Sequence, residues 1–377
     1  MALVLFGVLF LGVSDTQLVP PLLPLIARQM STTPGRAGTI VTTYSLAAAI
    51  FALIAGPLSD RIGRKRVLTL GLVIFATSSF LTYYVTSFST LLIVRMLTGL
   101  SAGCLSTCSL SYAGDHYPYA QRGRAMGILS MAYFGALVIG VPVGSAVASR
   151  WGWHIIFAGL AVVAVLVFTL MLAFLPPDHQ RERHPFSWRS LAGHFKKSDR
   201  LAGMVAAFLT SGGIVGFLTY VGAWLTIDHS VSVTKVGLLF MAAGFAAVAA
   251  SPIAGWLSDR IGKRAVIVVS NIALACLFLV IARMQWGIPV VLGIAALSVA
   301  ASARQAPLHA LTTELVNAEV RGEYVALRNA ASQFGIASIA AASSYAFDSG
   351  GFSRVAIIAA IVTALVPVSC IWIHEPR

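Results

Sequence analysis

Charged residues are scarce in this sequence. Asp, Glu, Lys and Arg together make up 10% of its 377 residues, while apolar residues make up 58%. The mean hydropathy is +0.86. Because a soluble domain carries roughly 25% charged residues, the composition excludes a soluble globular protein and indicates a chain that crosses a membrane many times.

The signatures of enzymes are also missing. The sequence has no Gly-Lys-Ser or Gly-Lys-Thr loop that would cradle a nucleotide phosphate, and its histidines are scattered. Cys104 and Cys108 share a helix face, but no His or further Cys is placed to complete a metal site with them. We therefore expect no enzyme activity, no cofactor and no bound metal.

Twelve apolar runs are long enough to cross the hydrocarbon core, which takes roughly 20 helical residues. They are centred near residues 15, 48, 77, 102, 137, 164, 213, 246, 275, 301, 335 and 363. We predict an all-α integral membrane protein with an N-terminal six-helix bundle (1–175), a cytoplasmic linker (176–200) and a C-terminal six-helix bundle (201–377). The linker is either a plain tether or carries a short amphipathic helix on the membrane surface.

The basic residues are distributed unevenly between the two sides of the predicted membrane. The net charge is +13, and Lys and Arg concentrate in alternate turns, such as 61–66 and 260–264, and in the linker. This is the positive-inside pattern. It places both termini in the cytoplasm, predicts a multi-pass protein of the cell (inner) membrane, and explains the basic charge without a nucleic-acid partner.

One short phrase occurs twice, 199 residues apart. It reads GPLSDRIGRK over residues 56–65 and GWLSDRIGKR over residues 255–264, and each copy lies between two apolar runs. The same offset brings Asp115 onto Glu314. The chain is therefore built from two halves of equal length and similar construction.

Six helices, a linker and six matching helices, with this turn after the second helix of each half, resemble the major facilitator superfamily of secondary transporters. The resemblance implies two pseudo-symmetric six-helix bundles that rock about a central site, so that access alternates between the two faces. It also implies that the turn latches the bundles in the outward-open state, with Asp60 in that role. The alternative is a turn that only sets topology. The residues assigned to gating on this basis are Gly56, Asp60, Arg61, Gly63, Arg64, Asp115, Asp259, Arg260 and Glu314.

Asp15 is the only acidic residue near the middle of a predicted span. Desolvation favours the neutral form of a carboxyl group, so Asp15 is the predicted proton site. Arg95 begins a stretch that resembles the superfamily's helix-4 motif, in which the arginine is linked to proton transfer. The resemblance implies that Arg95 lies near Asp15. The alternative for both residues is a purely structural role.

The second half carries its own polar residues. Arg304, Gln305 and His309 form a polar stripe without a counterpart in the first half, and we predict that it faces the substrate. Arg328 follows the turn at 321–323 and is expected to snorkel to the cytoplasm and hold the inner gate. The other predicted substrate-binding residues are Asp15, Gln17, Tyr44, Tyr133, Trp224 and Phe334.

The fifth apolar run carries the stretch GALVIGVPVG over residues 135–144. It resembles a motif of the exporting, proton-antiporting branches of the superfamily, although it departs from the usual Gly-Pro and Gly-Gly pairs. Gly135, Gly140, Pro142 and Gly144 are expected to bend the helix and to form a close helix contact that seals the cavity.

The sequence as a whole resembles the twelve-helix drug/proton antiporters. We expect an exporter that exchanges protons for a small amphipathic organic molecule, working as a monomer in the lipid bilayer. Two alternatives remain open: a proton-coupled importer of an anionic or zwitterionic metabolite, and a non-transporting membrane sensor on the same fold.

Overall fold

The computed structural model describes residues 1–177, 193–313, 315–316 and 321–372. Within these ranges the chain is almost entirely helical. The helices are α1 (Ala2–Gln29), α2 (Pro34–Ile62), α3 (Arg64–Tyr83), α4 (Phe88–His116), α5 (Tyr119–Gly135), η1 (Ala136–Gly140), α6 (Val141–Trp151), α7 (His154–Phe174), α9 (Ser198–Asp228), α10 (Val233–Ile261), α11 (Lys263–Ile281), α12 (Ile288–Thr313), α13 (Arg321–Ala364) and α14 (Val366–Ile371).

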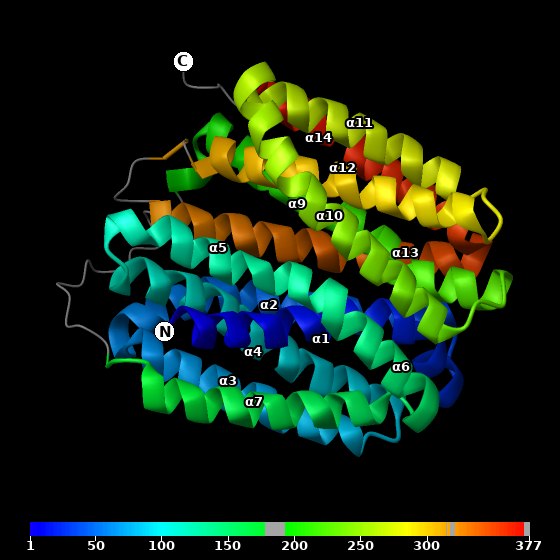
Figure 1. Ribbon diagram of the computed structural model, residues 1–377, viewed down its shortest axis with the longest axis horizontal. Coiled ribbons are helices and arrows are strands. Elements are labelled where there is room, and N and C mark those ends of the chain that lie inside the picture. Colours follow the sequence, from blue (N-terminus) through cyan, green and yellow to red (C-terminus); the bar gives the residue numbers. More distant parts are fainter. Residues whose placement is uncertain (178–192, 314, 317–320, 373–377) are drawn as a thin grey trace.

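The helices form two groups that lie side by side (Figure 1). Helices α1 to α7 form the lower group in this view and α9 to α14 form the upper group. The repeat seen in the sequence is present in the helix boundaries, because α2 and α10 begin and end 199 residues apart. The predicted pair of pseudo-symmetric bundles is thus confirmed. Of the predicted linker, only residues 176–177 and 193–200 lie within the described residues.

The number of spans agrees with the prediction once one kink is taken into account. Eleven segments among the described residues are long and apolar enough to cross a membrane, and the last of them runs from Gly322 to Ile371. This segment joins two spans, because Gly350 and Gly351 have non-helical backbone angles inside α13. The kink separates the eleventh predicted span from the twelfth.

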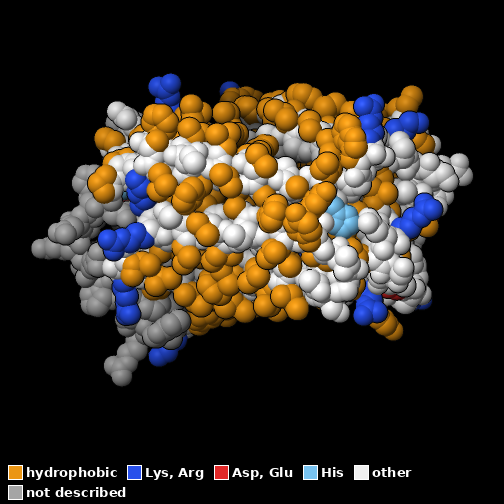
Figure 2. Space-filling view, turned by 90° about the horizontal axis from the view of Figure 1, so that it is seen from below, with side chains coloured by type: hydrophobic (Ala, Val, Ile, Leu, Met, Phe, Trp, Pro, Cys, Tyr) orange, Lys and Arg blue, Asp and Glu red, His pale blue; other side chains and the backbone are white. Residues whose placement is uncertain are grey.

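The surface has the distribution expected for a protein embedded in a bilayer. Figure 2 shows hydrophobic side chains covering the middle of one face, with Lys and Arg gathered toward the two ends of the molecule. We call the end that carries the Asp60 and Asp259 turns the inner end, following the predicted topology, and the opposite end the outer end. The orientation in the membrane remains a prediction.

The repeated turns at the inner end depend on glycine. Gly63 and Gly262 separate the second and third helix of each half and have φ angles of 105° and 92°. L residues with a Cβ rarely adopt this region, whereas glycine does so without strain. The chain can therefore end one helix and begin the next at a single residue.

Small residues allow the helices of each bundle to approach closely. A Cβ added at Gly99 of α4 would collide with the carbonyl oxygen of Tyr44 in α2, and one added at Gly335 of α13 would collide with the carbonyl oxygen of Phe208 in α9. Backbone-to-backbone contact of this kind is how helices gain packing energy inside a membrane.

Gly99→Ala should destabilise the protein, because the methyl group must push α4 away from α2. Overpacking of this kind costs about 1–3 kcal/mol, so the midpoint of thermal unfolding in detergent should fall by several degrees. Gly127→Ala is the matched control, since a Cβ there meets no neighbouring atom. Equal midpoints for the two variants would contradict this account of the packing.

Candidate functional site

Asp15 and Arg95 form a bidentate ion pair inside the N-terminal bundle. Arg95 Nη1 donates to Asp15 Oδ1 at 2.8 Å, and Nη2 donates to Oδ2 at 2.5 Å. Asp15 is 0% exposed and Arg95 is 1% exposed. The predicted proximity of the two residues, on α1 and α4, is therefore confirmed. Paired, they neutralise each other and can be buried in a medium that would not tolerate either charge alone.

Aromatic rings enclose the guanidinium group. Its central carbon lies 5.1 Å from the ring centroid of Tyr44 and 5.3 Å from that of Phe157. Contacts of this geometry stabilise a desolvated cation by about 2 kcal/mol. The Tyr44 hydroxyl in turn donates to the Gly12 carbonyl, 3.3 Å away on α1. The pair thus ties together α1, α2, α4 and α7.

The second half of the chain shows that the fold does not need this pair. The positions 199 residues after Asp15 and Arg95 are Ile214 and Ile294. Two apolar side chains occupy the equivalent places in the C-terminal bundle, so helix packing alone does not account for a buried carboxylate and a buried guanidinium. This comparison argues for a role beyond structure.

The fifth span, where a bend was predicted, changes helix type. Residues 136–140 form a π-helical turn between α5 and α6, and such turns are frequent at functional sites. A Cβ at Gly140 would come within 3.1 Å of Ser14 Oγ, and one at Gly144 would collide with Leu18. A Cβ at Gly135 would lie 3.5 Å from Phe10. The span therefore packs closely along α1, next to Asp15.

The same segment also contacts the other bundle. A Cβ added at Gly237 of α10 would lie within 2.6 Å of Ser145 and 3.4 Å of Pro142. One added at Gly244 would lie 2.9 Å from Val138 in the π-helical turn. The predicted close helix contact thus extends across the interface between the bundles.

Arg304 does not lie where the predicted polar stripe would place it. Its guanidinium donates to Asn271 Oδ1 at 2.5 Å and to the Thr210 carbonyl at 3.0 Å. The residue is 1% exposed, because it points into the packed interior of α9, α11 and α12. His309 and Gln305 are exposed. The stripe therefore divides into a buried arginine and two accessible side chains.

Arg328 contacts His309 instead of snorkelling to the inner end as predicted. Arg328 Nη1 donates to Thr312 Oγ1 at 3.0 Å, and Nη2 lies 2.6 Å from His309 Nδ1. Arg328 is 5% exposed. Hydrogen-bonding partners on α12 hold its side chain inside the bundle, which removes the reason for it to extend to water.

The predicted aromatic and amide residues fall into three environments. Tyr44 is buried beside Arg95, Gln17 and Phe334 are half-buried, and Tyr133 is 53% exposed. Trp224 was predicted to line the cavity but is 3% exposed. It stacks on Phe352 with centroids 4.6 Å apart and meets His229 edge-on. Its position near the outer end of α9 makes it a packing residue in this conformation.

The gating residues at the inner end form a small charged cluster in the N-terminal bundle. Arg64 contacts Asp60 at 3.2 Å and Asp115 at 2.5 Å, so it links the turn after α2 to the end of α4. Arg61, Asp259 and Arg260 are exposed. Gly56 would accept a Cβ without meeting any neighbouring atom. Glu314 lies outside the described residues.

The outer end is closed by contacts that sequence reasoning missed, and Asp348 of α13 is central to them. Its carboxylate accepts hydrogen bonds from Thr33 Oγ1 at 2.5 Å and from the Gly35 amide at 2.8 Å, both at the first turn of α2. The Gly35 carbonyl accepts from Ser344 at 2.8 Å and from Tyr220 at 3.2 Å. A carboxylate at a helix N-terminus is stabilised by the helix dipole.

The bundles also meet at the outer end between α6 and α10, at the place that the repeat relates to the contact between α13 and α2. The contact there is weaker. Ser149 lies 199 residues before Asp348, and its hydroxyl accepts a hydrogen bond from Thr234 of α10 at 3.1 Å. A pair of neutral hydroxyl groups here replaces the contact of the Asp348 carboxylate with the N-terminus of α2. The signal in the sequence was a departure from the repeat, an acid in the second half with no acid in the first.

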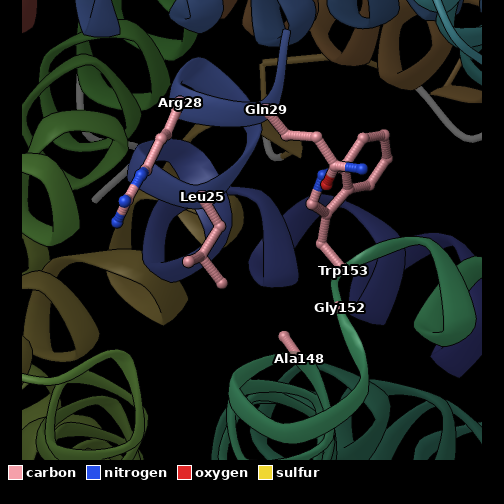
Figure 3. Close-up of a pocket in the computed structure, with 6 residues that line it drawn as sticks. All are labelled: Leu25, Arg28, Gln29, Ala148, Gly152 and Trp153. Atoms are coloured by element: carbon pink, nitrogen blue, oxygen red, sulfur yellow. The ribbon is translucent and has the colours of Figure 1, made fainter.

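A pocket of about 340 Å³ opens at the outer end within the N-terminal bundle. Figure 3 shows Leu25, Arg28 and Gln29 from the end of α1 facing Ala148, Gly152 and Trp153 from the junction of α6 and α7. All six residues that line it belong to one bundle. A site that both bundles close around in turn would need residues from each of them, so this pocket does not fit that description.

Comparisons with known proteins agree with this architecture. The family model for the Major Facilitator Superfamily matches residues 5–229 and again residues 203–377. The uncharacterized MFS-type transporter YceJ of Bacillus subtilis is 27% identical over 277 residues, which are 72% of this chain and 70% of that protein. The multidrug resistance protein MdtM of Escherichia coli is 29% identical over 196 residues, 52% of this chain and 47% of its own length. The crystal structure of a D-xylose-proton symporter superposes with a TM-score of 0.79 at 18% identity, covering 97% of this chain and 95% of the other.

Asp348→Asn should loosen the outer end, because it removes the charge at the N-terminus of α2. A loss of about 1–2 kcal/mol corresponds to about 5- to 30-fold more outward opening. The measurement uses a protein in which the four native cysteines are replaced and Ala340→Cys is introduced. Ala340 is buried two turns below Asp348 on α13. The rate at which a membrane-impermeant maleimide labels this cysteine reports outward opening. Ser149→Ala should raise the rate less, and labelling of Asp348→Asn at the unaltered rate would refute the role of Asp348.

Proposed function

The chain belongs to the Major Facilitator Superfamily, a family of secondary transporters, and we propose that it is a proton-coupled exporter of a small amphipathic organic molecule. The observation that carries this proposal is the buried Asp15–Arg95 pair, which is absent from the equivalent positions of the second half. Asp15 is the proton site in this proposal. Arg95 is its ion-pair partner, and loss of the Asp15 charge changes how Arg95 interacts with the surrounding helices.

The energetics of the pair supply the coupling. Neutralising one partner of a buried ion pair costs about 3–5 kcal/mol. The ring contacts of Arg95 with Tyr44 and Phe157 are made whether or not Asp15 carries a proton, so they do not replace the lost carboxylate. A change in the protonation of Asp15 therefore changes the stability of the helices packed around the pair, which is how occupancy of one site is converted into movement of the bundles.

The proposed cycle follows from this cost. Asp15 takes up a proton from the outside, its pairing with Arg95 weakens, and the bundles rock toward the inward-facing state. Release of the proton to the inside restores the pair and coincides with substrate loading. Return of the loaded transporter to the outward-facing state then exports the substrate.

The contacts between the two bundles support the assignment of this structure to the inward-facing state. At the outer end, Asp348 accepts a hydrogen bond from the Gly35 amide, and Ser344 and Tyr220 donate to the Gly35 carbonyl, which joins the bundles. Toward the inner end, Tyr133 and His309 from different bundles keep exposed side chains. This is the state in which an exporter loads its substrate.

The fifth span supports export over import. Its π-helical turn and glycines pack against α1 beside Asp15 and against α10 across the interface. Such a seal prevents protons from leaking past the site while the bundles move. The alternative is a proton-coupled importer, and the observation that favours it is the pair of buried arginines in the C-terminal bundle, Arg304 and Arg328, which suit an anionic metabolite.

Asp15→Asn should abolish coupled proton movement, because an amide cannot carry the proton. The measurement is proton flux in proteoliposomes that contain a pH dye, after addition of amphipathic cations, anions and zwitterions in turn. We expect substrate-dependent flux to fall by about 100-fold or more, as for loss of a group that transfers a proton. Asp228→Asn, which changes an exposed carboxylate at the outer end of α9, should retain the flux.

The sign of the proton movement distinguishes the alternatives. Protons moving opposite to the substrate identify an exporter, and protons moving with it identify an importer. Full coupled flux in Asp15→Asn would make the pair structural. Binding of a probe without any coupled flux in the unaltered protein would favour the membrane sensor.

A further inference from the structure

The C-terminal bundle holds a positive charge that no described carboxylate neutralises. Arg328 interacts with the His309 ring, the Thr312 hydroxyl and the phenol groups of Tyr133 and Tyr324. Its Nε atom is buried and makes no hydrogen bond within the described part of the chain. A buried arginine keeps its charge, so this site carries a net charge of about +1 and an unused donor.

The groups around Arg328 present donors. The two ring nitrogens of His309 lie 2.6 and 3.2 Å from Arg328 Nη2. Because a guanidinium can only donate, the nearer nitrogen must accept, and the ring is therefore neutral. Its other ring nitrogen then carries the proton. Arg328 Nε and the Tyr133 hydroxyl can both donate hydrogen bonds. Such a set of donors matches a ligand group that can only accept, such as a carboxylate or a phosphate.

The site lies where a transported molecule can reach it. His309 is exposed, and Gln305, one turn earlier on the same face of α12, is exposed as well. Tyr133 is 53% exposed and belongs to α5 of the other bundle. The groups therefore face the interface between the bundles from both sides, which a site that opens and closes with their rocking requires.

The internal repeat shows that these polar residues are not needed for folding. The positions 199 residues before His309 and Arg328 are Leu110 and Leu129. Leu129 is 0% exposed, so an apolar side chain fills the equivalent place in the first bundle. A charge that the fold can do without, in a region where it costs several kcal/mol, needs another reason.

We propose that Arg328 and His309 bind the anionic group of the substrate, and that the transported molecule is an amphipathic organic anion. This inference rests on the proposed transport function and names its substrate class. Arg304, the second buried arginine without a described carboxylate partner, adds to the positive field of the same bundle. The aromatic surface of Tyr133 provides a contact for the apolar part of the molecule.

The test compares three probes that differ in charge but share a naphthalene ring: 1-naphthoate, 1-naphthamide and 1-naphthylmethylammonium. Binding to the purified protein in detergent is measured by calorimetry and by the rise in the unfolding midpoint. We expect 1-naphthoate to bind more tightly than the neutral and cationic probes. Arg328→Gln should weaken its binding by about 30-fold or more, as for removal of one partner of a buried charge contact.

Further variants separate recognition from folding. Arg328→Lys keeps the charge without the planar fork, and should retain part of the preference for the anion. His309→Ala removes a hydrogen-bond partner of Arg328, and should weaken 1-naphthoate by about tenfold. Arg354→Gln removes an exposed charge at the outer end of α13 and should change nothing.

Two results would overturn the proposal: equal binding of the three probes, or unchanged binding of 1-naphthoate in Arg328→Gln and His309→Ala. The proton-flux assay is read separately. Coupled flux with only the neutral or cationic probe would leave the transport function intact and refute the anion site. Arg328-dependent binding of 1-naphthoate without coupled flux would support the anion site and refute the transport function.

Discussion

The cost of burying charge in a bilayer is the constraint on which this structure depends. Asp15 and Arg95 meet it by neutralising each other in a bidentate pair with both residues at most 1% exposed. The arrangement is stable only while both are charged, because an unpaired charge there costs several kcal/mol. A single proton can therefore change the preferred arrangement of α1, α2, α4 and α7 without any large ligand.

The repeat separates what the fold needs from what the function needs. The two halves share helix boundaries and glycine turns at an offset of 199 residues. They differ where charge is buried: Asp15 and Arg95 correspond to Ile214 and Ile294, and Arg328 corresponds to Leu129. The proposed proton site lies in one bundle, and the basic, donor-rich site lies in the other. An exchanger of protons for an organic anion would use both.

Much of this fold could be predicted from the sequence, because long apolar runs indicate the membrane helices and the repeat divides them into two bundles. The proximity of Asp15 and Arg95 was expected from the resemblance to the superfamily, in which helices 1 and 4 both line the cavity. The contacts of Arg304 and Arg328 were not. The contact of Arg304 with Asn271 depends on how α11 and α12 are rotated, and that of Arg328 with His309 depends on α12 and α13. The role of Asp348 depends on a contact between residues 313 apart, which no local pattern reveals.

The most direct test of the central claim is the distance between the outer ends of the two bundles as the pH is changed. Spin labels at the exposed positions Thr86 and Gln285 would report it by pulsed electron resonance, with the native cysteines replaced. The account predicts that acidic buffer shifts the unaltered protein toward the short, outer-closed distance, and that Asp15→Asn shows this distribution in acidic and alkaline buffer alike. A distribution that ignores pH in the unaltered protein, or that responds equally in Asp15→Asn, would contradict it.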